Sequence, residues 1–540
     1  MEQSVQYREI HLKRANDECR IMKIVPYTPH ARRLAAIIVI VVIAAPGLFA
    51  AYAGSCFGSL IAFDSYLGNT PVDYSSLIPA NNTELANLAS GYEYYLERDN
   101  LPINYTLSCV WNESFSAISE YTVTDDGAIW TGMMLAAAVF QYVVAERDGN
   151  ATEISNATLL LHRLISGVVL LMAVPNGGIG PQYPGILARS VCPDTWDHAH
   201  APIQGLTNED GVNVFYGKGN YSSWWWVGYP SLDQYSGIIM GLTTAAALIH
   251  DDPWVQERVD AMILQIAGYM RETNWCLMDG DNRTTGQSFQ YKYEHPSYWL
   301  LSILFMASLV DPATYLPLYH QWAYENGYAT DAMLQSDLTF FITDNFYTYN
   351  INWDILFAMA VFETDPVLKA TYQRLVSQVL YPPVRNLRDA WFNLAYLLVM
   401  NSTNSNIQKD ISDQLMRFGL ERIPGQANST LMPERGLNST GSFYSGLIPA
   451  TWPQTTLSGW LAKNPSYPAA AVNPIVSIFG KSTVFLTQPL TVDHMASNEF
   501  LFQESPVIYS TYSPANVQQS GLSYLLPYWM ARYAGFISGE

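Results

Sequence analysis

Residues 127–147 read GAIWTGMMLAAAVFQYVVAER, and this run decides the fold. Its apolar residues recur three and four positions apart, the spacing of one face of an α-helix, and it contains no proline. Asp125 and Asp126 precede the run, and Asp is among the residues favoured just before a helix begins. The stretch therefore predicts a helix whose first turn follows an acidic pair.

The same periodicity recurs along most of the chain. Asp252-Pro253 and Asp311-Pro312 mark two helix starts, because proline occupies a first turn without losing a hydrogen bond. The thirteen predicted helices span 83–98, 127–147, 153–172, 234–250, 253–273, 297–309, 312–326, 331–341, 352–362, 365–380, 388–400, 406–421 and 522–534. This pattern favours an all-α fold.

Long connections separate some of the predicted helices. The segments 175–230, 278–296 and 424–520 are rich in Gly, Pro and aromatic residues, and loops of such length are usually functional or disordered. Residues 472–486 and 500–510 predict a few short β-strands. Helices in pairs, joined alternately by short turns and long aromatic loops, fit a closed ring of helical hairpins whose loops line one face.

An uncharged apolar run near the start predicts a membrane anchor. Residues 34–53 read LAAIIVIVVIAAPGLFAAYA, which at about 1.5 Å per residue spans the roughly 30 Å core of a bilayer. The tail before it carries seven Lys or Arg against four acids, and the positive-inside rule keeps such a tail cytoplasmic. We therefore expect a single-pass type II membrane protein with a cytoplasmic tail (1–33), a transmembrane helix (34–54), a stem (55–85) and an extracellular or lumenal helical domain (86–540).

Glycosylation signals and cysteines agree with that topology. Ten Asn-x-Ser/Thr sequons lie beyond the apolar run, where average composition gives about three by chance. The predicted glycosylation sites are Asn81, Asn104, Asn112, Asn150, Asn156, Asn220, Asn282, Asn401, Asn428 and Asn438. Cys56, Cys109, Cys192 and Cys276 lie on the same side and allow up to two disulfides, in three connectivities.

Composition narrows the class of partner. The net charge of −20 argues against nucleic acid. Aromatic residues make up 13% of the chain and charged residues only 14%. This balance suits neutral sugars, whose ring faces stack on aromatic side chains and whose hydroxyls bond amides and carboxylates, and it equally suits a large aromatic core. We expect a carbohydrate partner, a membrane contact through residues 34–53, and no cofactor.

Several segments resemble signature motifs of the six-hairpin glycosidase-like superfamily, whose fold is an (α/α)6 toroid. They begin at Thr124 (TDDGAIWTGMMLAAAVFQYVV), Ser231 (SLDQYSGIIMGLTTAAALI), Asn274 (NWCLMDGDNRTTG), Tyr347 (YTYNINWDILFAMAVFETDPVLKATY), Glu499 (EFLFQESP) and Gly521 (GLSYLLPYWMARYAG). Together they cover roughly residues 115 to 535 in order. The resemblance implies an all-α toroid, and it leaves the reaction open because the superfamily contains glycoside hydrolases, polysaccharide lyases and an epimerase.

The chain departs from the motifs at three places. Phe502 and Glu504 stand where a Trp and an Arg are expected, and Gln287-Ser288 stand where an aromatic residue is usual. Altered substrate contacts, or loss of catalysis, would follow from such changes.

Glycoside hydrolysis needs two carboxyl groups that flank the scissile bond, and a separation of about 6.5 to 9.5 Å implies inversion. The catalytic candidates are Asp126, Asp233, Asp125 and Glu294. Each precedes or begins a predicted helix, and Asp caps helices whether or not it does chemistry. Asp233 is distinguished by the aromatic stretch SSWWWVGYPSL before it.

Aromatic and polar neighbours of these acids are candidate sugar contacts. The predicted substrate-binding residues are Trp130, Trp224, Trp225, Trp226, Tyr229, Tyr235, His295, Asp279 and Asn352. We expect no metal site. The loop DGDNRTTG has Arg283 where a calcium loop needs a third oxygen ligand and lacks the closing Glu, and CPDTWDHAH lacks the spacing of HExxH.

The sequence thus favours a membrane-anchored carbohydrate-active enzyme, most simply a glycoside hydrolase. A non-catalytic glycan-binding or structural cell-surface glycoprotein is the alternative, because some motif positions are replaced. A uronate lyase or epimerase is third. It would use Arg189, His198, Tyr235 or His295, and the acidic chain offers no basic cluster for such a substrate.

Overall fold

The computed structural model describes residues 72–122, 126–196, 213–290, 296–334, 347–419, 484–485, 489, 491–494, 506, 508–509 and 516–539. All of them belong to one compact unit, Phe63–Glu540. The predicted tail (1–33) and transmembrane helix (34–54) lie outside the described residues. Residues 82–85 of the predicted stem already form the first turn of a helix of this unit.

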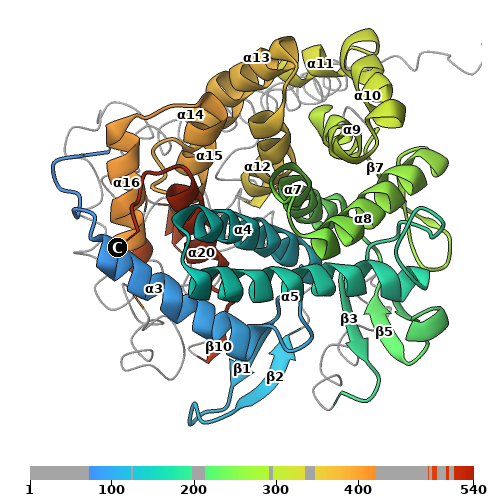
Figure 1. Ribbon diagram of the computed structural model, residues 1–540, viewed down its shortest axis with the longest axis horizontal. Coiled ribbons are helices and arrows are strands. Elements are labelled where there is room, and N and C mark those ends of the chain that lie inside the picture. Colours follow the sequence, from blue (N-terminus) through green and yellow to red (C-terminus); the bar gives the residue numbers. More distant parts are fainter. Residues whose placement is uncertain are drawn as a thin grey trace, which may run out of the picture. The chain divides into compact units, whose positions relative to one another are not determined.

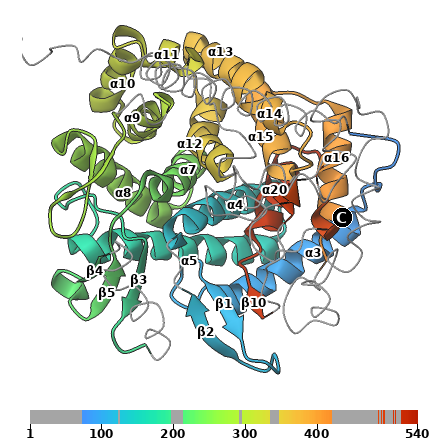
Figure 2. The same cartoon turned by 180° about the vertical axis from the view of Figure 1, so that it is seen from behind.

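The unit is mainly α-helical, as predicted, and its longer helices come in pairs (Figures 1 and 2). Five pairs follow one another in the chain: α4 (Gly127–Asp148) with α5 (Ala151–Asn176), α7 (Leu232–Leu248) with α8 (Pro253–Glu272), α9 (Tyr298–Val310) with α10 (Pro312–His320), α12 (Tyr347–Phe362) with α13 (Pro366–Leu375), and α15 (Ala390–Met400) with α16 (Ser405–Met416). The last long helix, α20 (Leu522–Tyr533), packs against the first, α3 (Asn82–Tyr95). Shorter helical segments are α11 (Tyr328–Leu334), α14 (Tyr381–Val384) and turns at Leu96–Asn100, Gly219–Tyr221, Gln321–Glu325, Val376–Leu380 and Val492–His494.

The first members of the pairs contact one another in sequence order. Helix α4 packs on α7, α7 on α9 and α12, α9 on α12, α12 on α15, α15 on α20, and α20 on α4. Each of them also packs against its own second member. The first members therefore make a closed series of contacts, with the second members beside them.

Capping side chains explain why the turns within the pairs are short. Asn150, Asp252, Asp311, Asp365 and Asn404 each accept a hydrogen bond from a backbone N–H in the first turn of the second helix. Such caps satisfy backbone donors that a helix start leaves without partners. In three of these helices a proline follows the cap, which agrees with the predicted starts.

Small antiparallel sheets occupy the long connections. One sheet has the order β10 (Val517–Gln518), β1 (Ser108–Trp111), β2 (Ile118–Thr122), and another has β3 (Ser190–Pro193), β5 (Trp224–Val227), β4 (Val214–Tyr216). The pairs β6 (Cys276–Met278) with β7 (Thr284–Ser288) and β8 (Val484–Phe485) with β9 (Ile508–Tyr509) complete the described strands. β8 and β9 fall in the two segments predicted to contain strands, whereas β3, β4, β5, β7 and β10 lie elsewhere in the three long connections. β1, β2 and most of β6 lie between predicted helices, outside those connections.

Glycines bring α4 and α7 into close contact. A β-carbon on Gly237 would lie 2.2 Å from the carbonyl oxygen of Ile129, and one on Gly132 would lie 2.2 Å from the carbonyl of Gly237. A β-carbon on Gly241 would lie 2.3 Å from the carbonyl oxygen of Gly132. No larger residue fits at this seam unless the two helices move apart.

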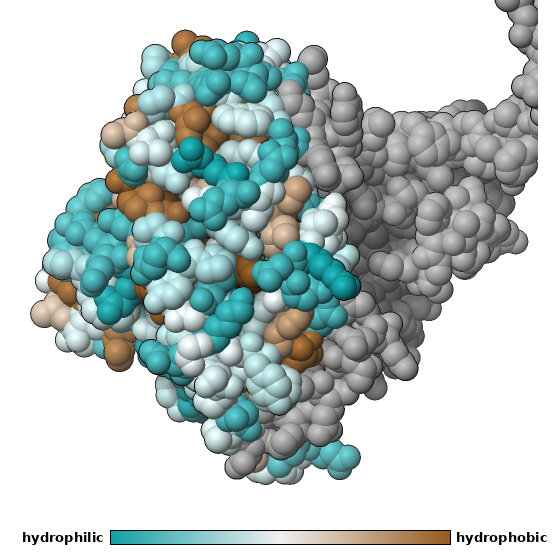
Figure 3. Space-filling view, turned by 90° about the vertical axis from the view of Figure 1, so that its right-hand side faces the viewer, coloured by the Kyte–Doolittle hydropathy of each residue, from teal (hydrophilic) through white to brown (hydrophobic). Residues whose placement is uncertain are grey.

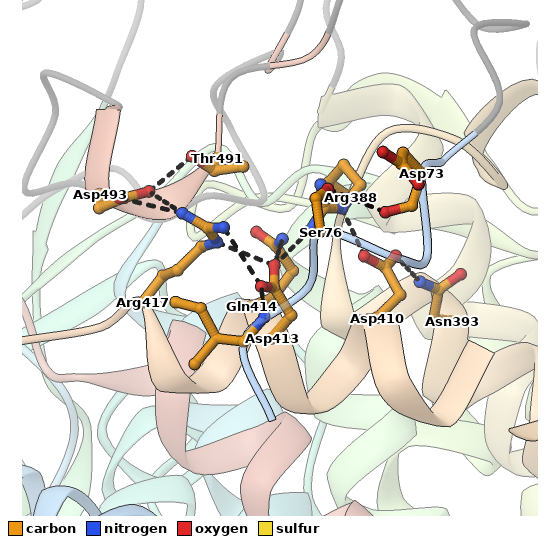
Figure 4. A network of polar contacts seen from close by, with 11 residues as sticks. Asp73, Ser76, Arg388, Asn393, Asp410, Asp413, Gln414, Arg417, Thr491 and Asp493 are labelled. Atoms are coloured by element: carbon orange, nitrogen blue, oxygen red, sulfur yellow. Dashed lines mark hydrogen bonds and ion pairs between the residues drawn. The ribbon is translucent and has the colours of Figure 1, made fainter. Parts of the chain in front are cut away.

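A charged network fastens the segment before α3 and a late segment of the chain to the α15–α16 pair (Figure 4). Asp413 on α16 is fully buried and accepts hydrogen bonds from Arg388, Arg417 and the backbone N–H of Ile78. Arg417 also contacts Asp493, with 3.1 Å between Nη1 and Oδ2. The network therefore joins segments that are far apart in the sequence.

Two described helices, α4 and α5, are long and apolar enough to cross a membrane by length and composition. Helices buried inside a folded domain pass the same test, and α4 is buried among α5, α7 and α20. Neither lies near the N-terminus. On the face drawn in Figure 3, hydrophobic residues of the described part form separate small patches among hydrophilic ones.

The described cysteines form no disulfide with one another. Cys109, Cys192 and Cys276 are free thiols, and Cys56 lies outside the described residues.

We expect Gly237→Ala to lower the free energy of unfolding by about 1–3 kcal/mol, because the added methyl group collides with the α4 backbone. Gly268→Ala is the matched control, since nothing lies within 4 Å of its β-carbon position, and removing a helical glycine should stabilise by roughly 0.5–1 kcal/mol. Denaturant unfolding of both variants measures the difference. Equal stability of Gly237→Ala and the parent would contradict the close contact.

Asp413→Asn should lower the free energy of unfolding by about 3–5 kcal/mol, because Arg388 and Arg417 keep their charges in a buried site that has lost its shared carboxylate. Asp148 also bonds two arginines, but its side chain is 30% exposed, so Asp148→Asn should cost about 1 kcal/mol or less. The same unfolding measurement compares the two. If Asp148→Asn lowered the free energy of unfolding more than Asp413→Asn does, the buried network around Asp413 would not be the more stabilising of the two.

Candidate functional site

The starts of α4 and α7 bring two predicted catalytic residues into one cluster. Asp126 is the residue before α4, and Asp233 lies in the first turn of α7. The Nε2 of Gln234, next to Asp233, donates a 3.0 Å hydrogen bond to Oδ1 of Asp126. Both carboxylates also lie near the positive ends of helix dipoles, which favour negative charge.

Neither carboxylate caps its own helix. Asp126 occupies the cap position of α4 but makes no side-chain capping hydrogen bond. At α7 the cap position is Ser231, which makes none either. Instead, Oε1 of Gln287 accepts a 2.8 Å hydrogen bond from the backbone N–H of Leu232. Gln287, which stands where we expected an aromatic residue, lies on β7, and this strand supplies a hydrogen bond to the start of α7.

Arg189 links the two acids. Its Nη2 donates a 2.7 Å hydrogen bond to Oγ of Ser231, whose hydroxyl in turn donates to Asp233. Its Nη1 lies 3.9 Å from Oδ1 of Asp126, and its Nε donates to the carbonyl oxygen of Tyr229 at 2.9 Å. The guanidinium therefore compensates negative charge while it holds the loop before α7.

Tyr347, the first described residue of α12, completes the cluster. Its hydroxyl donates a 2.9 Å hydrogen bond to Oδ2 of Asp233, and its ring meets the ring of Trp130 edge-on at 6.0 Å. Burial raises the pKa of Tyr347 well above its usual value, and the negative charges of Asp233 and Asp126 raise it further. The hydroxyl thus stays protonated and acts as a donor toward Asp233.

The predicted aromatic contacts divide between the surface and the interior. Tyr229 is 38% exposed, and Trp224 and Trp225 are half-buried on β5. Trp226, the next residue of that strand, is buried with its ring stacked on Phe215 at 4.8 Å. Trp130 is also buried. Of this group, Tyr229 is the most exposed residue, and its hydroxyl donates to the carbonyl oxygen of Thr285.

Three other predicted contacts are buried and bonded to protein groups. Tyr235 donates to the carbonyl oxygen of Gly185, and Asn352 accepts from Tyr298 and Trp299. Asp279 accepts a 2.8 Å hydrogen bond from the backbone N–H of Tyr229, whose φ of 53° is uncommon for a residue other than glycine. Asp279 therefore stabilises the backbone conformation of Tyr229.

The remaining candidates lie outside the described residues. These are Asp125, Glu294 and His295, together with Asp197, His198 and His200 of the CPDTWDHAH loop. In the described ranges, no group of three or more His, Cys, Asp or Glu side chains is arranged to hold a metal ion.

The predicted glycosylation sites differ in exposure. Asn104 and Asn112 are half-buried, and Asn428 and Asn438 lie outside the described residues. The exposed sites are Asn81, Asn150, Asn156, Asn220, Asn282 and Asn401.

Sequence reasoning did not find Ser231, Gln287 and Tyr347 as partners of the acids, and it considered Arg189 only for a lyase. Ser231 and Tyr347 stand at the starts of two motif segments, and that position was the available signal. Gln287 was visible only as a departure from the motif.

We expect Tyr347→Phe to lower the free energy of unfolding by about 1–3 kcal/mol, because Oδ2 of Asp233 loses a donor in a partly buried site. Tyr324 also donates to a carboxylate, Asp365, but its side chain is 44% exposed, so water replaces the lost donor in Tyr324→Phe. Thermal or denaturant unfolding distinguishes the variants. An equal effect of both would mean that the Tyr347 hydroxyl is not held as described.

No family model, no curated protein and no solved structure matches the chain.

Proposed function

We propose that the chain is a membrane-anchored carbohydrate-active protein whose helical domain is an (α/α)6 toroid. The closed series of contacts from α4 through α7, α9, α12, α15 and α20 back to α4 supports this architecture, as does the pairing of each of these helices with a second one. In such an arrangement the first helices of all pairs begin at the same end. The starts of α4, α7 and α12, which carry the cluster of Asp126, Asp233 and Tyr347, fit that expectation.

The activity that the cluster supports best is glycoside hydrolysis. The observation that carries this proposal is that Asp126 and Asp233 stand at the starts of two adjoining helices and accept hydrogen bonds from side chains: Asp126 from Gln234, and Asp233 from Ser231 and Tyr347. Oδ1 of Asp126 accepts from Gln234, and both oxygens of Asp233 accept from Ser231 and Tyr347; these donors hold the two acids in place for acid/base work. The exposed ring of Tyr229 offers a surface for a sugar face.

Contacts of the described residues make a lyase or epimerase the weaker proposal. Tyr235, one of the bases considered for it, is buried and bonded to backbone. Arg189 is occupied by Ser231, Tyr229 and Asp126, which leaves it poorly placed to neutralise a uronic carboxylate.

A second candidate is glycan binding without turnover. It is favoured by the engagement of Asp233, because Ser231 donates to one of its oxygens and Tyr347 to the other. A carboxylate held in this way is a good acceptor for sugar hydroxyls and a poorer proton donor.

Location remains part of the proposal. The uncharged run 34–53, the basic tail and the sequons suggest a type II topology, and six sequon asparagines are exposed. A glycan within reach of the membrane surface is then the expected substrate.

The test is a glycan-library screen of the full-length chain, in detergent or membranes, for both binding and release of sugar. We expect turnover by the parent and a loss of roughly 10²–10⁴-fold in Asp126→Asn and in Asp233→Asn. Glu257→Gln is the control, since that carboxylate is 80% exposed on α8, and it should behave as the parent. Binding without turnover in the parent would support the second candidate, and unsaturated products would support a lyase.

A further inference from the structure

An acid that the proposed reaction does not use is buried beneath the cluster. Asp354 on α12 is fully buried, and its Oδ2 accepts a 3.1 Å hydrogen bond from Nδ2 of Asn350, which is also fully buried. Oδ1 of Asp354 and Oδ1 of Asn350 have no hydrogen-bond partner in the described structure. Buried polar atoms of this kind are rare and call for an explanation.

The described contacts of Asp354 that favour its charged form come from two neutral side chains, Asn350 and Ser236. Burial raises its pKa well above the usual range, and the Ser236 hydroxyl on α7 opposes that rise. The titratable groups on the helices that pack against α12 are Asp233 and Tyr235 on α7, Tyr298 on α9, Lys369, Tyr372 and Arg374 on α13, and Tyr396 on α15, with Asp389 just before α15. The two cations among these bond to backbone: Lys369 donates to the carbonyl oxygen of Val361 at 2.6 Å, and Nε of Arg374 donates to the carbonyl oxygen of Ala370 at 3.4 Å. Burying an ionised carboxylate with neutral partners alone is strongly unfavourable, because it loses its hydration and gains no opposite charge.

Asp354 shares a helix face with the candidate site. Tyr347, Asn350 and Asp354 are spaced by three and four residues, so they lie along one side of α12. At the top of this side Tyr347 bonds Asp233, and lower down Asn350 Nδ2 lies 3.8 Å from the sulfur of Met133 on α4. Helices α7 and α12 lie side by side (Figure 1). The interface between α7 and α12, called here the α7–α12 seam, therefore includes both the Tyr347–Asp233 contact and the buried acid.

We propose that Asp354 holds a proton in the folded protein and is a positioning residue for Tyr347 and Asp233, so that loss of this proton at high pH loosens the α7–α12 seam and ends activity. The effect on activity rests on the proposed function, but the proton on Asp354 does not.

Linkage gives the proton a measurable signature. The unfolded chain releases it near the ordinary Asp value of 3.8, whereas the folded chain keeps it to a higher pH. Stability is therefore complete below about pH 4 and falls as pH rises, by up to about tenfold in the unfolding equilibrium constant per pH unit. Asp354→Asn mimics the protonated acid without titrating.

The first experiment compares denaturant unfolding of the full-length parent and Asp354→Asn from about pH 4 to pH 8. We expect similar stability near pH 4 and a growing advantage of the variant above it. The ratio of the two unfolding equilibrium constants should change by up to about tenfold per pH unit, which corresponds to one proton. Parallel profiles, or a variant less stable at every pH, would show that the ionised form is the one the fold needs and would overturn the proposal.

Infrared spectroscopy identifies the protonation state directly. At pH 7 the parent should show a protonated-carboxyl band that Asp354→Asn lacks. If that variant does not fold, Asn350→Ala provides the second test, because loss of the Nδ2 donor should shift the same band. A carboxylate band at this position, or a band that Asn350→Ala leaves unmoved, would contradict the assignment.

Glu93→Gln tests whether an effect on activity is specific to Asp354 or arises from any buried acid. Burial raises the pKa of Glu93 to about 8, and its Oε1 accepts from Gln141 and Trp529 away from α12. Glu93→Gln should remove a stability slope but leave the alkaline limit of turnover unchanged, whereas Asp354→Asn should move that limit to higher pH. An unmoved limit in Asp354→Asn would refute the positioning role. If no glycan is turned over, the unfolding and infrared results still decide the protonation state.

Discussion

The contact between α4 and α7 determines how the candidate site is built. Gly132, Gly237 and Gly241 let the two backbones approach more closely than side chains permit. This approach fixes the start of α7 against the start of α4, so Gln234 reaches Asp126. Once the seam is set, α12 meets α7 and its first described residue reaches Asp233. Backbone packing, and not a flexible loop, therefore sets the relation between the two acids.

Periodicity predicted the helices well, because their apolar spacing and their Asp and Asn caps are local features. The starts at Pro253 and Pro312 match the structure. The small sheets were harder to predict, since strands such as Ser108–Trp111 pair with Val517–Gln518, about four hundred residues away. A two- to five-residue strand gives little pattern of its own, and its partner is not visible in one sequence.

For the site, the acids themselves were predictable and their partners were not. Asp126 and Asp233 stand out because acids at helix starts follow a simple rule, but the same rule made capping an equal explanation. In the structure, Gln287 on β7 accepts a hydrogen bond from the backbone N–H at the start of α7, which sequence alone cannot indicate. Trp226 and Tyr235 were predicted to contact sugar but are buried. Aromatic composition alone does not distinguish residues that form a binding surface from residues that form the core.

The partnership of α3 with α20 has a consequence for the order of folding. Tyr92 of α3 stacks on Tyr524 of α20, and the Tyr524 hydroxyl bonds the carbonyl oxygen of Leu85. Helix α3 therefore lacks this partner until α20 has been synthesised, and contacts of such sequence separation form slowly. Until then, the side of α3 that packs on α20 stays uncovered by it, so this contact belongs to a late step of folding.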